Sequence, residues 1–132
     1  MLKKDYLHLE TTNRCTLKCP GCPRTVWQNL IKQPIQKADL NPDHLKSFLD
    51  CKSMEDIDKF TLCGDYGDTI YYPHLFRLIK MFREKAFSIS TNGSYKSKEW
   101  WTELNRLLTD RDRIIFGIDG LGDQNLKYRV NA

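Results

Sequence analysis

The amino-acid sequence predicts an α/β fold in which βα repeats build a parallel sheet. Two observations carry this prediction. Short strand-like segments alternate with helical segments along the chain, and each strand-like segment ends in a polar loop. Strands that alternate with helices imply right-handed crossovers, which place the strands parallel in one sheet. The 132 residues, 40% of them hydrophobic and 29% charged, are enough for one globular domain with its own core.

Four segments are predicted as strands from their apolar or alternating pattern. In the first, Leu7 and Leu9 alternate with polar neighbours, which is the period of a strand. The third, AFSIST, is stopped by Asn92-Gly93, a turn-forming pair. The four predicted strands are Tyr6–Glu10, Asp58–Cys63, Ala86–Thr91 and Arg113–Ile118.

Helix signals fall between these strands. Asn41-Pro42 marks a helix start, with Asn as the N-cap and Pro at the first helical position. Leu45, Phe48 and Leu49 follow it at the spacing of an apolar helix stripe. Ser97 is a second predicted N-cap. The other predicted helical segments are His74–Lys85, Ser97–Leu108 and a helix that begins within Asp123–Ala132.

The chain between the first strand and Asn41 is expected to be mostly irregular. Thr11–Thr25 is polar and broken by proline and glycine, so it is predicted as a loop. Trp27–Ala38 has no clean period, although Leu30 and Ile31 are compatible with a turn or a short helix.

Four polar, glycine-bearing loops follow the four predicted strands: a cysteine-rich loop, GDYGD, TNG and DGLGD. In a parallel sheet the carboxyl ends of the strands lie at one edge, where ligands and catalytic groups collect. We therefore expect an active site at that edge. The sheet would also have an open lateral edge, so we expect a further segment or a partner chain to cover it.

Charge and cysteine usage limit the function classes. The net charge is +4, and Lys and Arg are interleaved with Asp and Glu, which is typical of a solvated surface rather than a nucleic-acid face. No apolar run approaches the roughly 18 residues that span a bilayer. The basic start Met1–Lys4 precedes a polar strand-like segment, so no signal peptide is expected. We expect a cytoplasmic protein without a membrane partner, where an odd count of five cysteines disfavours a disulfide framework.

Three cysteines are clustered as Cys15-Thr-Leu-Lys-Cys19-Pro-Gly-Cys22. Their thiolates, on one loop, can each bind a different iron of a cubane cluster and leave one iron open. A structural zinc site is the alternative, but such sites usually have four ligands, and Cys51 and Cys63 are isolated in the sequence. Buried thiols without a metal are a third interpretation, which the hydrophilic surroundings disfavour.

The segment LHLETTNRCTLKCPGCPRT resembles the first strand and cluster loop of the radical S-adenosylmethionine superfamily. The resemblance extends from Tyr6 to Arg129, and the cysteine spacing is its most specific element. It implies a [4Fe–4S] cluster on Cys15, Cys19 and Cys22, S-adenosyl-L-methionine as a second cofactor, an external one-electron reductant and a substrate that the sequence does not identify. The implied reaction is reductive cleavage of S-adenosylmethionine to a 5′-deoxyadenosyl radical, which abstracts hydrogen from the substrate.

The resemblance also implies that the parallel sheet belongs to a partial, incomplete TIM-like barrel of about four βα units. Residues 1–132 would then form a single core domain, truncated relative to the family, with the C-terminal βα units absent. Two alternatives remain open. One is a zinc-stabilised nucleic-acid-binding module, and the other is a cluster-binding fragment without catalytic activity.

The loop after the second predicted strand stands where the family has Gly-Gly-Glu. The resemblance assigns Tyr66, Gly67 and Asp68 to cofactor binding. Glycine lets backbone approach a ligand, and a carboxylate can pair with the ammonium group of the cofactor. A simple turn is the alternative. Asn92, in a segment that resembles the TNG of the family, is expected to contact a ribose or a carboxylate, although Asn-Gly is also a common turn.

Two further cofactor contacts are implied near the end of the chain. Asp119 resembles a ribose contact, in a segment where Gly117 replaces the usual Ser, and a helix N-cap is its alternative role. Arg129, in the pair Tyr128-Arg129, is expected to meet the carboxylate of the cofactor.

Gly21 stands where many family members have an aromatic residue close to the adenine. We therefore expect Trp27 or Tyr66 to supply the stacking. His8 on the first strand either faces the site or is a packing residue.

Overall fold

The computed structural model of the chain describes residues 6–51, 54 and 56–131. The start Met1–Lys4, on which the expectation of no signal peptide rests, and Ala132, at the end of the last predicted helix, lie outside the described residues. The strands are β1 Leu7–Leu9, β2 Lys59–Leu62, β3 Ala86–Thr91 and β4 Arg113–Phe116. The helices are α1 Pro23–Ile31, α2 Pro42–Leu49, the 3-10 turn η2 Thr69–Tyr71, α3 Leu75–Met81, α4 Lys98–Leu107 and α5 Asp123–Tyr128. Within the described ranges, no helix is long and apolar enough to cross a membrane.

The four strands form one sheet in the order β1-β2-β3-β4, and all three pairings are parallel. Each strand therefore lies beside the next one in the sequence, as in a segment of a βα barrel. The carboxyl ends are in register, since Leu62 pairs with both Leu9 and Ile89. The predicted α/β class and parallel sheet are confirmed.

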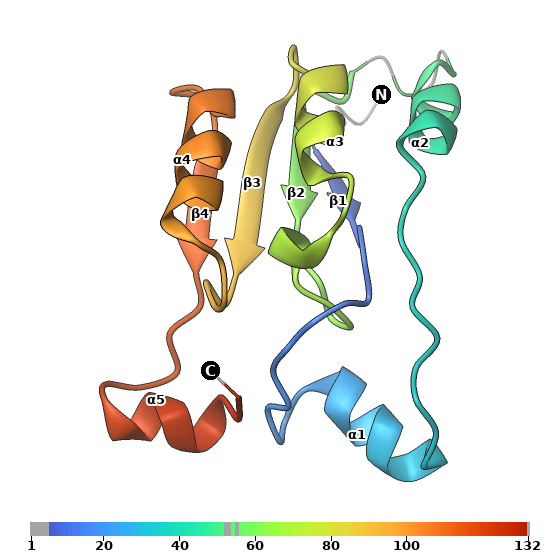
Figure 1. Cartoon of the computed structure of the whole chain (residues 1–132). Helices are drawn as coiled ribbons and strands as arrows, with labels where there is room; N and C mark the ends of the chain where they lie inside the picture. The colour runs from blue at the N-terminus through green and yellow to red at the C-terminus, as the bar shows by residue number, and fades with distance from the viewer. Residues whose placement is uncertain (1–5, 52–53, 55, 132) are drawn as a thin grey trace.

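The helices occupy two different positions around the sheet. Figure 1 shows α3 and α4 on one face, with α2 beside α3, whereas α1 and α5 lie beyond the arrowheads of the strands. The helix-covered face is the core, where Phe60 packs edge-to-face on Phe82 and Phe87 with ring centroids 5.2 and 5.6 Å apart. Burying one such side chain stabilises the fold by roughly 1.5–3 kcal/mol. The apolar residues at 0% exposure in the described structure are Phe60, Leu62, Leu78, Ile79, Ile89 and Leu104.

The opposite face of the central strands is polar. Side chains alternate between the two faces of a strand, so the neighbours of the core residues point away from the helices. Thr61 pairs with Ser88 in the register, and Ser88 is buried. Polar side chains such as these do not form the apolar surface that would pack against a second layer.

The two predicted helix caps are present. The side chain of Asn41 accepts a hydrogen bond from the Asp43 backbone N–H at 2.9 Å, and Pro42 is the first residue of α2. Ser97 Oγ accepts from the Trp100 N–H at 3.2 Å at the start of α4. Such caps satisfy backbone donors that have no partner inside the helix.

Two element predictions need correction. Helix α1 begins at Pro23, inside the segment predicted as a loop, and continues to Ile31. Proline at the first helical position does not break a helix, and the apolar side chains of α1, such as Trp27 and Leu30, are exposed instead of packed on the sheet. The second concerns the predicted stripe of α2: Leu45 is buried, whereas the side chain of Phe48 is 48% exposed.

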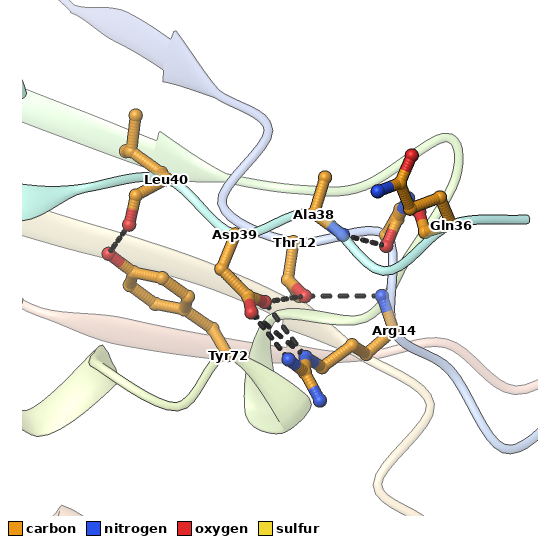
Figure 2. Close-up of polar contacts among 8 residues, drawn as sticks. Thr12, Arg14, Gln36, Ala38, Asp39, Leu40 and Tyr72 are labelled. Atoms are coloured by element: carbon orange, nitrogen blue, oxygen red, sulfur yellow. Dashed lines mark hydrogen bonds and ion pairs between the residues drawn. The ribbon is translucent and has the colours of Figure 1, made fainter.

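A polar network ties the extended segment between α1 and α2 to the loop after β1 (Figure 2). The guanidinium of Arg14 donates to both carboxylate oxygens of Asp39, with Nη2–Oδ2 at 2.6 Å and Nε–Oδ1 at 2.9 Å. Thr12 Oγ1 donates to the same carboxylate at 2.7 Å. The Arg14 guanidinium accordingly lowers the pKa of Asp39 from its ordinary value. This network fixes the start of the cysteine loop.

The lateral edge at β4 carries exposed apolar side chains. Ile115 and Phe116 are 48% and 52% exposed, and Ile118 beyond the strand is 71% exposed. This exposure agrees with the expected open lateral edge. That a further segment or a partner chain covers the edge stays a prediction.

Candidate functional site

A cavity of about 440 Å³ opens at the carboxyl ends of the strands. Its lining comes from the cysteine loop, α1, the loops after β2, β3 and β4, and the end of α5. The structure brings to this one cavity all the residues that the sequence assigned to the metal or to direct cofactor contacts, apart from the stacking candidate Trp27. They are Cys15, Cys19, Cys22, Tyr66, Gly67, Asp68, Asn92, Asp119 and Arg129.

The cysteine loop is held by its own backbone and by the C-terminal segment. The N–H of Cys22 donates to the carbonyl of Cys19 at 3.0 Å, which closes a turn between them. Cys22 is also the N-cap residue of α1, and its carbonyl accepts the N–H of Val26 at 3.0 Å. The N–H of Lys18 donates to the carbonyl of Val130 at 3.0 Å, so the cysteine loop contacts the C-terminal segment at the site.

The thiols of the loop are free and half-buried. Burial raises the pKa of Cys15, and the nearby carboxylate of Asp68 adds to the rise. Burial also raises the pKa of Cys19, although the positive charge of Arg129 acts in the opposite direction. Both thiols are therefore protonated in the metal-free protein at neutral pH and must release their protons to bind a metal.

No three His, Cys, Asp or Glu side chains in the described parts of the chain converge on a point that could hold a single metal ion. A mononuclear zinc site requires such convergence, because all its ligands lie about 2.0–2.3 Å from one ion. A cubane places a different demand on the protein, since each thiolate binds its own iron and the sulfurs stay apart.

Asp68 is buried and is already hydrogen-bonded within the chain. Its Oδ1 accepts from Thr91 Oγ1 at 2.8 Å and from the Ile70 N–H at 3.1 Å, and its Oδ2 accepts from the Asn92 N–H at 2.7 Å. The Asp68 N–H in turn donates to the carbonyl of Arg14 at 2.8 Å. Asp68 thus joins the loop after β2 to the end of β3 and to the cysteine loop, a structural role that the sequence did not reveal.

Gly67 is required for a different contact from the one expected. A Cβ at this position would lie 2.0 Å from the carbonyl oxygen of Thr12. The close approach on the Cβ side is therefore between two loops of the protein, and Gly67 also lines the cavity. Tyr66, next to it, is 48% exposed and lines the cavity.

Asn92 reaches back to the cysteine loop. Its Nδ2 lies 3.5 Å from Cys15 Sγ in hydrogen-bond geometry. Its Oδ1 accepts from the backbone N–H of Ser94 at 2.8 Å and also from Ser94 Oγ. The amide is thus fixed at both ends.

Asp119 and Arg129 form an ion pair at the cavity, with Nε–Oδ2 at 2.6 Å and side-chain exposures of 38% and 13%. Asp119 is not the N-cap of α5, because Gly122 holds that position, so the alternative role as a helix cap is wrong. The geometry of the pair is not that of a hydrogen bond, and the buried Nε of Arg129 has no hydrogen-bond partner within the described structure.

At Gly21 and Gly117 the side-chain space is filled by side chains of α5 and of the residue after it. A Cβ at Gly21 would lie 2.8 Å from Tyr128 Oη, and a Cβ at Gly117 would lie 2.8 Å from Arg129 Nη2. Tyr128 therefore takes the place of a side chain at position 21 and lines the cavity. Its role was missed because the contact joins positions far apart in the sequence.

Arg24 and Cys63 also line the cavity and were not predicted. Nη1 of Arg24 donates to the carbonyl of Leu17 at 3.3 Å, whereas its buried Nε has no partner among the described residues. Cys63 had seemed isolated because its distance from the cluster motif in sequence is large. Its position at the carboxyl end of a strand was the signal that could have placed it at the site.

Trp27 and His8 do not line this cavity. Trp27 contributes to a second cavity of about 460 Å³, between the loop after β1 and the segment that precedes α2, and Tyr66 lines both cavities. His8 Nε2 lies 2.9 Å from the carbonyl oxygen of Cys63 in hydrogen-bond geometry, which supports a packing role.

Comparison with known proteins gives a similar structure and a similar sequence, each matched over less than half of its own length. No protein-family model matches the sequence. The structure resembles that of BtrN. The similarity has a TM-score of 0.65 at 17% identity and covers 92% of this chain and 48% of that one, which was solved in complex with AdoMet and 2-DOIA. In sequence, the chain is 28% identical over 118 residues to the tungsten-containing aldehyde ferredoxin oxidoreductase cofactor-modifying protein of Pyrococcus furiosus.

The chain spans less than half of either protein: 88% of it aligns with 31% of the Pyrococcus furiosus protein. At this level of similarity the BtrN structure supports the fold, namely four parallel strands with alternating helices.

The donor set of the cavity is suited to a cluster and an anionic or zwitterionic ligand. Three thiols can supply thiolates to separate irons. The buried Nε of Arg24 has no hydrogen-bond partner in the described structure, which is costly unless a ligand accepts from it, whereas the Nε of Arg129 lies 2.6 Å from the Asp119 carboxylate. A carboxylate is the usual partner of such a group.

Proposed function

We propose that the chain is the N-terminal part of a radical S-adenosylmethionine core and that its cavity holds a [4Fe–4S] cluster with S-adenosylmethionine beside it. The observation that carries the proposal is the convergence of the three-cysteine loop and the loops after β2, β3 and β4 on one cavity. The similarity of the fold to BtrN, solved in complex with AdoMet, supports it. When bound, the reduced cluster supplies one electron that cleaves S-adenosylmethionine to methionine and a 5′-deoxyadenosyl radical, which abstracts hydrogen from a substrate.

Within this proposal Cys15, Cys19 and Cys22 are the cluster ligands. Arg24 binds the carboxylate of S-adenosylmethionine through its buried Nε, which has no hydrogen-bond partner in the described structure, and Arg129 binds the same carboxylate beside its ion pair with Asp119. Arg129 must then share its charge between Asp119 and the ligand, or exchange one for the other.

The proposed cofactor contacts at the loop after β2 are Tyr66, Gly67 and Asp68. Because Asp68 accepts three hydrogen bonds from the chain, we assign it to holding this wall of the cavity in place and to adding negative charge there for the ammonium group of the ligand. Asp119 is the proposed ribose contact, and Tyr128 is the aromatic side chain nearest to Gly21.

The proposal includes the source of the electron but does not identify the substrate. An external one-electron reductant supplies the electron, and the substrate stays unassigned. Because the chain spans 31% of the Pyrococcus furiosus protein and 48% of the BtrN chain, we assign to these residues the cluster and S-adenosylmethionine steps only. Turnover of a substrate by the whole protein, in the cytoplasm, is part of the proposal.

Anaerobic reconstitution tests the proposed function. With iron and sulfide, the protein should turn brown and bind about three to four irons per chain. With dithionite and S-adenosylmethionine it should then release 5′-deoxyadenosine. A reconstituted protein that shows neither iron uptake nor 5′-deoxyadenosine would falsify the proposal. Iron uptake without product would support the alternative of an inactive cluster-binding fragment.

A zinc site is the second candidate, because Cys63 brings a fourth thiol to the same cavity. Four cysteines are a common structural zinc ligand set. The absence of a convergent set among the described residues counts against it.

Two substitutions separate the candidates. If three thiols hold a cluster, Cys19→Ser should abolish iron binding and Cys63→Ser should leave the iron content unchanged. If four thiols hold zinc, either substitution should reduce the zinc content measured by atomic emission. Colourless protein with one zinc and salt-sensitive binding to RNA or DNA would favour the zinc-stabilised nucleic-acid-binding module.

A further inference from the structure

One of the three thiols of the cysteine loop receives a hydrogen bond from a side chain of a different loop. Nδ2 of Asn92, after β3, lies 3.5 Å from Sγ of Cys15. A neutral thiol is a weak acceptor for an amide N–H. A thiolate carries a negative charge, so the same hydrogen bond to it is stronger.

The orientation of the Asn92 amide is determined by its surroundings. Its Oδ1 accepts from both the backbone N–H and the hydroxyl of Ser94. Rotating the amide by half a turn would place the NH₂ group against these two donors and the oxygen against sulfur. The contacts therefore assign the NH₂ group to the sulfur.

The backbone around Asn92 is also fixed. Its N–H donates to the buried carboxylate of Asp68 at 2.7 Å. The carbonyl of Ser94 accepts from the hydroxyl of Tyr71 at 2.6 Å, and that hydroxyl accepts from Thr16 Oγ1 at 3.1 Å. Thr16 is the neighbour of Cys15 in the sequence, so a closed set of contacts holds the donor and the sulfur in a fixed relation.

The other polar contact of a loop thiol is of a different kind. Sγ of Cys22 lies 3.8 Å from the backbone carbonyl of Asp65, where the thiol is the donor. That contact requires a proton on sulfur and is lost when Cys22 becomes a thiolate. The Asn92 contact, in contrast, gains strength on deprotonation of Cys15.

We propose that Asn92 is a positioning residue for the cluster, which donates a hydrogen bond to the Cys15 thiolate and raises the reduction potential of the cluster. The proposal rests on the proposed function, because it assumes that Cys15 is a cluster ligand. Reduction adds negative charge to the cluster and its sulfurs, and a donor aimed at a ligand sulfur stabilises the reduced form more than the oxidised form. This role differs from the ribose or carboxylate contact that the sequence suggested.

The test is a redox titration of the reconstituted protein, followed by the EPR signal of the reduced cluster without S-adenosylmethionine. Asn92→Asp keeps an oxygen for the Ser94 donors and replaces the NH₂ group with a second oxygen. Asn92→Ala removes the side chain. Both should show a midpoint potential lower than that of the wild type, with the larger shift for Asn92→Asp because it also adds negative charge. Iron content is measured in each sample.

Ser94→Ala is the matched control. It disturbs the same loop but keeps the Ser94 backbone donor to Asn92 and the NH₂ group toward sulfur, so its potential should stay closer to the wild type than that of either Asn92 variant. Equal potentials for wild type and Asn92→Asp, at equal iron content, overturn the inference and leave the proposed function standing. Wild-type protein that takes up no iron overturns both.

A measurement on the wild type decides the matter if the Asn92 variants do not assemble a cluster. Protein labelled with ¹⁵N at the side-chain amide of asparagine should show a weak ¹⁵N coupling to the reduced cluster in pulsed EPR. Absence of that coupling overturns the inference.

Discussion

At the scale of single residues, the carboxylate of Asp68 connects three parts of the site. It accepts hydrogen bonds from Thr91, Ile70 and Asn92, while its own N–H donates to Arg14. The sequence predicts that Asp68 contacts the ligand. In the structure its carboxylate also accepts three hydrogen bonds from the protein. No local sequence pattern reveals these buried contacts.

Asp68→Asn should destabilise the fold, because the amide NH₂ cannot accept both sets of hydrogen bonds. Leaving one buried donor without an acceptor costs roughly 1–3 kcal/mol of the free energy of unfolding. Urea denaturation of the metal-free protein measures this loss. Asp65→Asn, at an exposed neighbouring position, is the control and should change the stability by less than about 0.5 kcal/mol. Equal stability of the two variants would contradict the role of Asp68.

The sequence predicts those site residues whose position follows from a nearby motif or from the end of a strand. The cysteine spacing and the strand ends place the predicted residues at one cavity, since these signals need only the order of elements. Cys63 could also have been placed at the site from its position at the end of a strand. The contact of Tyr128 with Gly21 could not be predicted in this way, because it depends on packing between segments distant in sequence.

At the scale of elements, N-cap residues and the helical spacing of apolar residues predicted the helices that pack on the sheet. Asn41 and Ser97 are caps as expected, and Leu78 and Ile79 of α3 are buried. Helix α1 was not predicted, although Val26, Trp27 and Leu30 are spaced as on one face of a helix. That helix lies beyond the strand ends, and these side chains are exposed and do not pack on the sheet.

Besides the bonds that Thr12 and Arg14 make to Asp39, a titratable phenol holds the segment between α1 and α2. Tyr72 Oη donates to the carbonyl of Leu40 at 2.6 Å (Figure 2), and burial together with the charge of Asp39 raises the pKa of Tyr72 to about 12. The phenol thus titrates in the folded protein above its ordinary value of 10.0. A raised pKa stabilises the fold below pH 10 and loses this contribution as the pH rises toward 12.

Tyr72→Phe should lower the free energy of unfolding by about 1 kcal/mol at neutral pH, because it removes one hydrogen bond. The difference between wild type and variant should shrink as the pH rises above 10. Denaturation curves at several pH values measure both effects. Tyr95→Phe, at a 64% exposed position, is the control and should show neither. A difference that is constant up to pH 12 would contradict the assignment.

At the scale of the whole molecule, the chain is a four-stranded parallel sheet with helices on one face and the site beyond the strand ends. The pattern of βα repeats predicts this arrangement because parallel strands and right-handed crossovers admit few other topologies. What lies against the exposed side chains at β4 could not be predicted in the same way, since it depends on surfaces outside these residues.

The central claim is that Cys15, Cys19 and Cys22 hold a cluster with one iron open to S-adenosylmethionine. EPR of the reconstituted, dithionite-reduced protein, recorded with and without S-adenosylmethionine, tests it most directly. The account predicts a reduced [4Fe–4S] signal whose g-values change when S-adenosylmethionine is added. A signal that is absent, or one that is the same with and without S-adenosylmethionine, would contradict it.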